Sequence, residues 1–145
     1  MRILVQRCDS ASVKVDNKTV GSIDKGMMIL VGFTQTDTSE IIDYMIDKIL
    51  NLRIYDDENG VMNKSILDTG GSILSVSQFT LYADASKGRR PSYVKALGGE
   101  KAILLYEEFN SKLKGSGIHI ETGIFGAEMK VNLINDGPIT IMLEK

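Results

Sequence analysis

Hydrophobic and polar residues alternate over most of the first third of the chain, which predicts β-strands. In residues 11–16, for example, Val13 and Val15 are separated by polar side chains. Residues 26–33 differ, because they are hydrophobic throughout and bounded by glycine, a pattern typical of a strand buried on both faces. We therefore expect this segment at the centre of the sheet. The predicted strands of this region are 2–8, 11–16, 20–23 and 26–33.

Two segments show the periodicity of amphipathic helices. The first has Asp37 and Glu40 at the spacing of a capping box, followed by a hydrophobic stripe that ends at Leu50. The second follows Pro91, which suits the first turn of a helix. Its hydrophobic positions continue beyond a possible interruption at residues 98–99. The sequence therefore predicts two main helices that pack on the sheet.

Further strand-like segments cover residues 52–55, 73–81 and 118–145. The middle segment is unusually polar, since Ser75, Ser77, Gln78 and Thr80 stand among its hydrophobic residues. Polar side chains inside a sheet require hydrogen-bond partners. Their presence here indicates a structural or functional role.

A Gly-Pro pair interrupts the last strand-like segment. Residues 129–134 and 139–143 would each form half of a hairpin, and the intervening Asn-Asp-Gly-Pro is typical of a tight turn. Proline cannot donate a hydrogen bond to a neighbouring strand, and the bond that precedes it is the only peptide bond with easy access to the cis form. The local residues favour a turn at Gly137-Pro138 and leave a functional role open.

Composition adds limits to this picture. The 145 residues are 43% hydrophobic and 25% charged, with a net charge of −2, which is ordinary for a soluble single-domain protein. Nucleic-acid binding would therefore need a local basic patch. The single cysteine, Cys8, excludes an intramolecular disulfide and is expected to be buried in the first strand. Without a signal peptide or an apolar run of about 18 residues, we predict a cytoplasmic protein that does not enter a membrane.

The sequence contains few side chains that could act as a catalytic base or bind a metal. His119 is the only histidine and lies in an alternating stretch, so a Ser-His-Asp or Cys-His arrangement is improbable. One histidine and one distant cysteine do not form a zinc site, and there is no phosphate-binding loop or dinucleotide fingerprint. We predict no metal and no cofactor. If the chain is an enzyme, its substrate and its backbone must supply much of the chemistry.

The polar strand and the Gly-Pro pair together resemble the signature segments of one family, the D-aminoacyl-tRNA deacylases, also known as the D-tyrosyl-tRNA deacylase family. The resemblance covers essentially the whole chain, in the expected order, and departs only in having Ile139 where the family often has valine. The matching segments are 2–7, 52–55, 62–65, 77–82, 86–92 and 135–140.

The family resemblance implies a homodimer that hydrolyses the ester between a D-amino acid and the 3′ end of tRNA. It places the pocket at the dimer interface, where residues 77–80 of one subunit face Gly137-Pro138 of the other. In the family the Gly-Pro bond is cis, and its two carbonyl oxygens occupy the space of an L side chain. Selection is then by exclusion of L-amino acids, and glycine should pass, so mischarged glycyl-tRNA is an expected substrate.

Roles for three more residues follow from the same resemblance. Arg7 matches the arginine that braces the Gly-Pro loop, although a surface ion pair is the alternative interpretation. Phe125 and Met129 match positions that pack around the terminal adenosine, to which a flat ring and a soft thioether are suited. Their spacing alone would favour a place in the hydrophobic core.

For the chemistry, the resemblance points to Ser77, Gln78, Phe79 and Thr80. Thr80 is the obvious nucleophile, but the sequence offers no base to activate it. Resemblance and inventory instead favour activation of water by the 2′-hydroxyl of the terminal ribose. Backbone N–H groups near Phe79 and Thr80 would hold the oxyanion, while Thr80 and Gln78 position the substrate.

The loop with Lys87, Arg89 and Arg90 is expected either to contact the tRNA backbone or to be merely solvated. Two other functions stay open: a non-catalytic nucleic-acid-binding module that uses this loop, and a structural dimer without a ligand. Pattern and resemblance together predict a single α/β domain over residues 1–145. Its three layers would be two packed β layers, forming a barrel-like sandwich, and a cover of two main helices.

Overall fold

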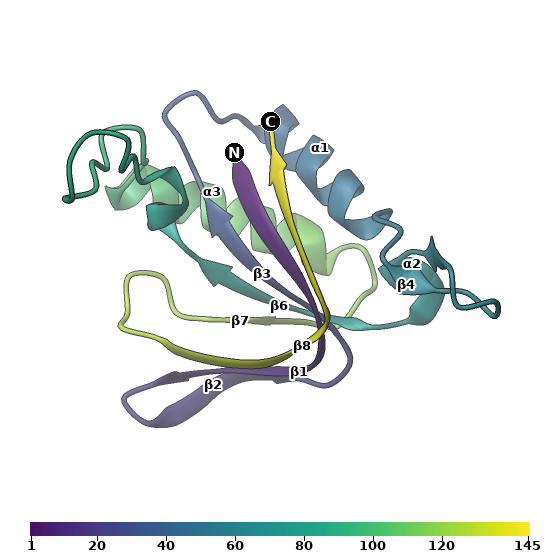
Figure 1. Ribbon diagram of the computed structural model, residues 1–145. Coiled ribbons are helices and arrows are strands. Elements are labelled where there is room, and N and C mark those ends of the chain that lie inside the picture. The colour runs from purple at the N-terminus through teal and green to yellow at the C-terminus, as the bar shows by residue number, and fades with distance from the viewer.

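A long first strand, β1 (Arg2–Val15), organises the sheet in the computed structural model, which describes residues 1–145 (Figure 1). One edge of β1 pairs antiparallel with β3 (Gly26–Gly32) at its start and with β2 (Lys18–Ile23) at its end. The other edge of β1 pairs antiparallel with β8 (Lys130–Glu144). Beyond β3, the sheet continues with two parallel neighbours, β6 (Ser72–Ser77) and β7 (Ile120–Thr122).

The sheet curls until its ends approach one another. Strand β2 packs back against β6 and β7, and Figure 1 shows the lower ends of β1, β2 and β8 turning beneath β6 and β7. Gly21 of β2 permits this approach, because a Cβ atom there would lie 2.9 Å from the carbonyl oxygen of Thr122. The result is the nearly closed, barrel-like arrangement that the sequence analysis predicted.

Helices α1 (Ser39–Leu50) and α3 (Gly99–Lys114) pack against each other and against the sheet. The short hairpin β4 (Tyr55–Asp56) and β5 (Met62–Lys64) precedes a single turn of helix, α2 (Ile66–Thr69). A 3₁₀-helix, η1 (Phe79–Tyr82), follows β6. None of these helices combines the length and hydrophobicity that crossing a membrane requires.

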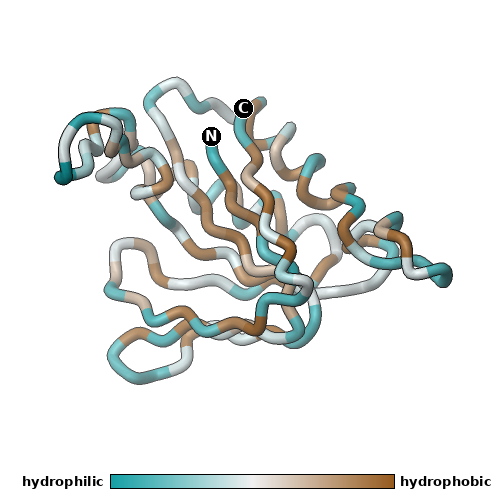
Figure 2. Tube along the Cα trace, viewed as in Figure 1, coloured by the Kyte–Doolittle hydropathy of each residue, from teal (hydrophilic) through white to brown (hydrophobic).

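Two hydrophobic clusters lie on opposite faces of the sheet. The larger fills the space between the sheet and the two main helices, and the smaller lies inside the curl. Strand β3 supplies both, since Met27 and Ile29 belong to the first cluster and Met28 to the second. This confirms the burial of β3 on both faces and the predicted three-layer α/β architecture. Figure 2 shows the corresponding hydrophobic positions along the strands and α1.

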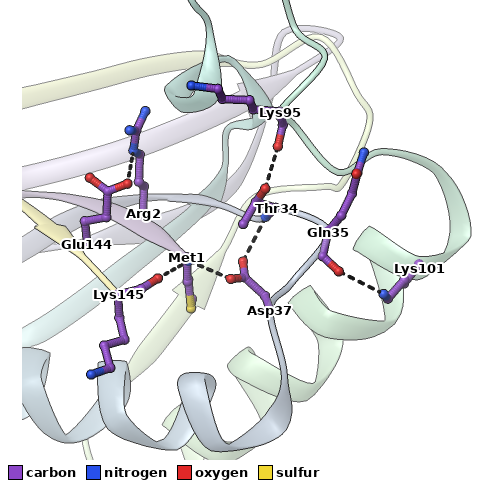
Figure 3. Close-up of polar contacts among 9 residues, drawn as sticks. All are labelled: Met1, Arg2, Thr34, Gln35, Asp37, Lys95, Lys101, Glu144 and Lys145. Atoms are coloured by element: carbon purple, nitrogen blue, oxygen red, sulfur yellow. Dashed lines mark hydrogen bonds and ion pairs between the residues drawn. The ribbon is translucent and has the colours of Figure 1, made fainter.

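The capping box predicted at Asp37 is wrong. Thr38 is the N-cap of α1, and the buried Asp37 carboxylate instead lies 2.6 Å from the N-terminal ammonium of Met1 (Figure 3). It also accepts a hydrogen bond from the Thr34 backbone N–H at 2.8 Å. The same ammonium donates to the Lys145 carbonyl at 2.6 Å, so the two ends of the chain meet beside the start of α1.

Three other predicted boundaries also differ from the structure. The helix expected at Pro91 begins only after Gly98, its N-cap, and residues 91–98 form an irregular connection. The strand expected at 52–55 is reduced to β4. The polar strand 73–81 ends at Ser77, where the chain passes into η1.

The Gly-Pro pair does not form a hairpin turn. Both flanking segments belong to β8 and pair with successive parts of β1: Asn135 lies opposite Cys8, and Thr140 lies opposite Gln6. Five steps along β8 therefore match two along β1, and residues 136–139 bulge out of the sheet. The Gly137-Pro138 bond is cis, and both residues are exposed.

Candidate functional site

The polar residues at the end of β6 divide into two groups. Ser75 is fully buried and meets α3, because the Tyr106 hydroxyl donates to its carbonyl oxygen at 2.8 Å. Burial raises the pKa of Tyr106, which keeps this hydroxyl protonated as a donor. Ser77 and Gln78 instead face a cavity, so only the second group is available to a ligand.

This cavity has a volume of about 250 Å³ and opens beside η1. The structure brings five of the predicted site residues together on its wall: Ser77, Gln78, Phe79, Phe125 and Met129. Most of the remaining lining is hydrophobic or small, including Val31, Phe33, Leu97, Ala102, Gly126 and Ala127. Such an apolar cavity with a few polar groups at one side is the usual form of a small-molecule site.

The other nine of the 14 lining residues were not predicted, among them Leu97, Ala102, Gly126 and Ala127. Nothing distinguishes such side chains from ordinary core or loop positions in a sequence. Their contribution is to the shape of the cavity, which depends on how the loop before α3 packs against β3: the Leu97 N–H donates to the Phe33 carbonyl at 2.9 Å.

Thr80 follows the lining residue Phe79 but does not itself line the cavity, and its hydroxyl has no base among the lining residues. It accepts a hydrogen bond from the Gln78 side-chain amide, and no titratable side chain lines the cavity. His119 is exposed and pairs with Glu121 at 3.1 Å, away from these lining residues. No group of three or more histidine, cysteine, aspartate and glutamate side chains is arranged to hold a metal ion.

Backbone geometry supplies donors where side chains do not. Phe79 and Thr80 are the first two residues of η1, and the first N–H groups of a helix have no acceptor inside it. These two N–H groups therefore lack an acceptor within η1 and lie next to Gln78 in the chain, whereas the following N–H, that of Leu81, donates to the Gln78 carbonyl at 3.3 Å. They are uncharged and need no change of protonation to act as donors.

The bulge with Gly137 and Pro138 does not line this cavity of its own chain. Arg7, which is 9% exposed, holds the base of the bulge: its Nε lies 2.8 Å from Asp136 Oδ2, and its Nη1 donates to the Ile54 carbonyl at 2.7 Å. The Asn135 side-chain amide adds hydrogen bonds to the carbonyls of Arg7 and Ile139, at 2.9 and 3.0 Å. Arg7 thus contacts the bulge through a carboxylate and not through the Gly-Pro carbonyls.

The cationic residues Lys87, Arg89 and Arg90 are exposed on the loop between η1 and α3. None of them forms an ion pair or a side-chain hydrogen bond in the structure, in contrast to Arg2, Arg7 and Lys112. Their charges therefore remain available to an external anion.

Comparison with known proteins gives consistent matches over nearly the whole chain. Residues 4–144 match the family model described as D-Tyr-tRNA(Tyr) deacylase. This chain is 59% identical to the D-aminoacyl-tRNA deacylase of Listeria monocytogenes serotype 4a (strain HCC23) and 55% identical to that of Shouchella clausii (strain KSM-K16). Each alignment spans 99% of this chain, and covers 95% and 99% of the respective relative.

Two solved structures share the fold. One, named c-Myc DNA Unwinding Element Binding Protein, has a TM-score of 0.94 and 40% sequence identity, covering 100% of this chain and 99% of its own. The other, described as a probable eukaryotic D-amino acid tRNA deacylase, has a TM-score of 0.85 at 19% identity, covering 98% of this chain and 97% of its own.

Proposed function

Because the chain belongs to the D-Tyr-tRNA(Tyr) deacylase family, we infer that it is a hydrolase that cleaves the ester between a D-amino acid and the 3′ end of tRNA. One structural observation supports this inference most strongly. The predicted residues Ser77, Gln78 and Phe79 share a cavity with Phe125 and Met129, which the resemblance associates with the terminal adenosine. The substrate ester would then lie against the start of η1.

The reaction in this site is a substrate-assisted hydrolysis. Water attacks the ester carbonyl carbon, helped by the ribose 2′-hydroxyl, and the N–H groups of Phe79 and Thr80 hold the oxyanion. The bond between the carbonyl carbon and the 3′ oxygen then breaks, and that oxygen leaves with a proton as free tRNA. The absence of a titratable side chain on the cavity wall supports a route that needs no protein base.

Chiral selection requires a second copy of the chain. Gly137 and Pro138 are exposed and lie outside the cavity of their own subunit, which supports a homodimer in which each bulge enters the partner's site. The bulge carbonyls then exclude an L side chain, while glycine passes and glycyl-tRNA is also cleaved. Lys87, Arg89 and Arg90 contact tRNA phosphates. We place this activity in the cytoplasm, with no cofactor.

Subunit complementation tests this arrangement. Gly137→Ala alters only the bulge and Gln78→Ala only the cavity, so hybrid dimers of two impaired variants regain one unaltered site. An equal mixture, unfolded and refolded together, should recover about a quarter of wild-type hydrolysis of D-aminoacyl-tRNA, since half of the dimers are hybrids with one intact site in two. A mixture no more active than its components contradicts sharing of sites.

A non-catalytic nucleic-acid-binding module is the second candidate. Two observations favour it: the three unpaired cations of the 87–90 segment and the name of the structure that is 40% identical. The net charge of −2 weighs against general affinity for duplexes. A salt titration of binding to duplex DNA and to uncharged tRNA distinguishes the two candidate functions. A non-catalytic module requires strong binding to both nucleic acids. The deacylase instead requires turnover of tRNA that carries an amino acid at its 3′ end.

A further inference from the structure

We propose that the exposed ring pair Phe79–Tyr93, here called the aromatic platform, stacks on the base of the nucleotide that precedes the terminal adenosine. The inference rests on the proposed function and extends it, because it assigns Tyr93 as a binding residue for the single-stranded 3′ end of tRNA. Neither the family resemblance nor the cavity itself accounts for Tyr93.

The two rings of the aromatic platform are close together, open to solvent and at the edge of the cavity. The two ring centroids are 5.2 Å apart and the planes are inclined by 56°, so the rings form an open corner. Phe79 is 52% exposed and Tyr93 42% exposed, although rings of this size are normally buried. Phe79 also lines the cavity, which places the platform directly at its edge.

The connection that carries Tyr93 is fixed at several points. Asp84 and Ser92 exchange two backbone hydrogen bonds of 2.8 Å, and the Ala96 N–H donates to the Tyr93 carbonyl at 2.9 Å. The Thr34 hydroxyl donates to the Lys95 carbonyl at 2.7 Å (Figure 3). The ring is therefore presented on an anchored backbone, and little conformational entropy is lost when a base stacks on it.

Charge identifies the occupant. The hydrogen-bonded pair Asp84–Ser92 closes the loop that carries Lys87, Arg89 and Arg90, so three unpaired cations lie on a loop whose base directly precedes Tyr93. Exposed aromatic rings combined with local positive charge are the features by which proteins bind single strands. A single-stranded nucleotide chain supplies both a base for the rings and phosphates for the cations, so one ligand accounts for both features of the surface.

The test compares two substrates with two variants. Tyr93→Ala removes the ring, and Tyr93→Phe keeps it; the substrates are D-tyrosyl-tRNA and D-tyrosyl-adenosine, which lacks the preceding nucleotides. For Tyr93→Ala we expect kcat/KM on D-tyrosyl-tRNA to fall by about 5- to 150-fold, the range for one stacked base. Its kcat/KM on D-tyrosyl-adenosine should equal that of the wild type, and Tyr93→Phe should resemble the wild type on both.

Each other result has a distinct meaning. An equal loss on both substrates would show that Tyr93 shapes the cavity, and no loss on either would show that no base stacks there; both overturn the proposal. Dissociation of the Tyr93→Ala dimer in sedimentation analysis would assign the platform to the subunit interface and also overturn it. If the wild type hydrolyses neither substrate, the proposed deacylase function itself fails.

Discussion

Thr80 presents a hydroxyl at the candidate site without the means to activate it. Its oxygen accepts a hydrogen bond from Gln78, and no base lines the cavity. We therefore expect Thr80→Val to lower the rate of D-tyrosyl-tRNA hydrolysis by at most about tenfold, the effect of roughly one lost hydrogen bond. Thr80→Ser is the control that keeps the hydroxyl.

Single-turnover kinetics with both variants check this expectation. Loss of a nucleophile costs about 10⁴-fold or more. A loss of that size in Thr80→Val, together with a covalent acyl-enzyme trapped on the wild type, would make Thr80 the nucleophile.

Gly137 has neither the backbone conformation nor the space for a side chain. Its φ is +113°, and an added Cβ would lie 2.8 Å from Ile139 Cγ1 and 2.9 Å from Ile139 N. Gly137→Ala must therefore distort the bulge, at a cost of roughly 1–3 kcal/mol, and we expect lower kcat/KM on D-tyrosyl-tRNA with a changed ratio of D to L hydrolysis. Gly60→Ala is the matched control, since Gly60 has a φ of +75° but no atom within 4 Å of the added Cβ.

Gly60→Ala should keep the wild-type activity and the wild-type ratio of D to L hydrolysis, because Gly60 lies in an exposed turn away from the bulge. If Gly137→Ala keeps both its activity and its chiral ratio, the bulge does not enter an active site.

For single residues, the local sequence pattern predicted less about the site than the family resemblance did. The spacing of Phe125 and Met129 favoured core positions, and both do pack against the hydrophobic clusters, but it did not predict that they also line the cavity. The four residues from Asn135 to Pro138 favoured a turn because local signals cannot report that β1 pairs with both flanking segments. Neither the cavity nor this pairing could be predicted from local signals, because the decisive contacts join residues far apart in the chain.

Among the elements, β3 and β6 approach each other too closely at their starts to admit a side chain at Gly26. A Cβ on Gly26 would lie 1.8 Å from the carbonyl oxygen of Ser72, its partner in the parallel pair. We expect Gly26→Ala to separate the two strands at this point and to lower the free energy of unfolding by about 1–3 kcal/mol or more. Urea denaturation measures this loss.

Gly98→Ala provides the comparison, because it adds the same methyl group in open space at a φ of −126°, which alanine adopts without strain. Equal stability of Gly26→Ala and the wild type would show that the start of β6 is not held against β3 as described.

Hydrophobic periodicity located both main helices, but it did not fix their starts. The stripe up to Leu50 correctly predicted α1, whereas Asp37 is engaged by the ammonium group of Met1 and cannot act as the cap. Likewise Pro91 suggested a helix start eight residues too early, since α3 begins at Gly99. Tertiary contacts, which a local pattern does not contain, decide these ends.

For the whole molecule, a buried polar contact ties the two ends of the chain together. Met1 and Asp37 form a buried ion pair, and Met1 also binds Lys145 (Figure 3). We expect Asp37→Asn to lower the free energy of unfolding by about 3–5 kcal/mol, because it leaves a buried ammonium without its counter-charge. The curl of the sheet, which brings β2 against β6 and β7, was predicted in outline only, through the family resemblance.

The control for this change is Asp43→Asn, which removes an exposed ion pair with Lys112 and should cost about 0–1 kcal/mol. Urea unfolding curves of the two variants, recorded at one pH, provide the comparison. Equal and small losses would show that the pair between Met1 and Asp37 does not hold the chain ends in solution.

The most direct test of the account as a whole is the rate of deacylation of one tRNA species charged with D-tyrosine and, separately, with L-tyrosine. The proposed site, in which backbone donors act on the ester and a partner's bulge excludes L side chains, predicts rapid release of D-tyrosine and retention of L-tyrosine on the tRNA. Equal rates for the two forms, or no release of either, would contradict it.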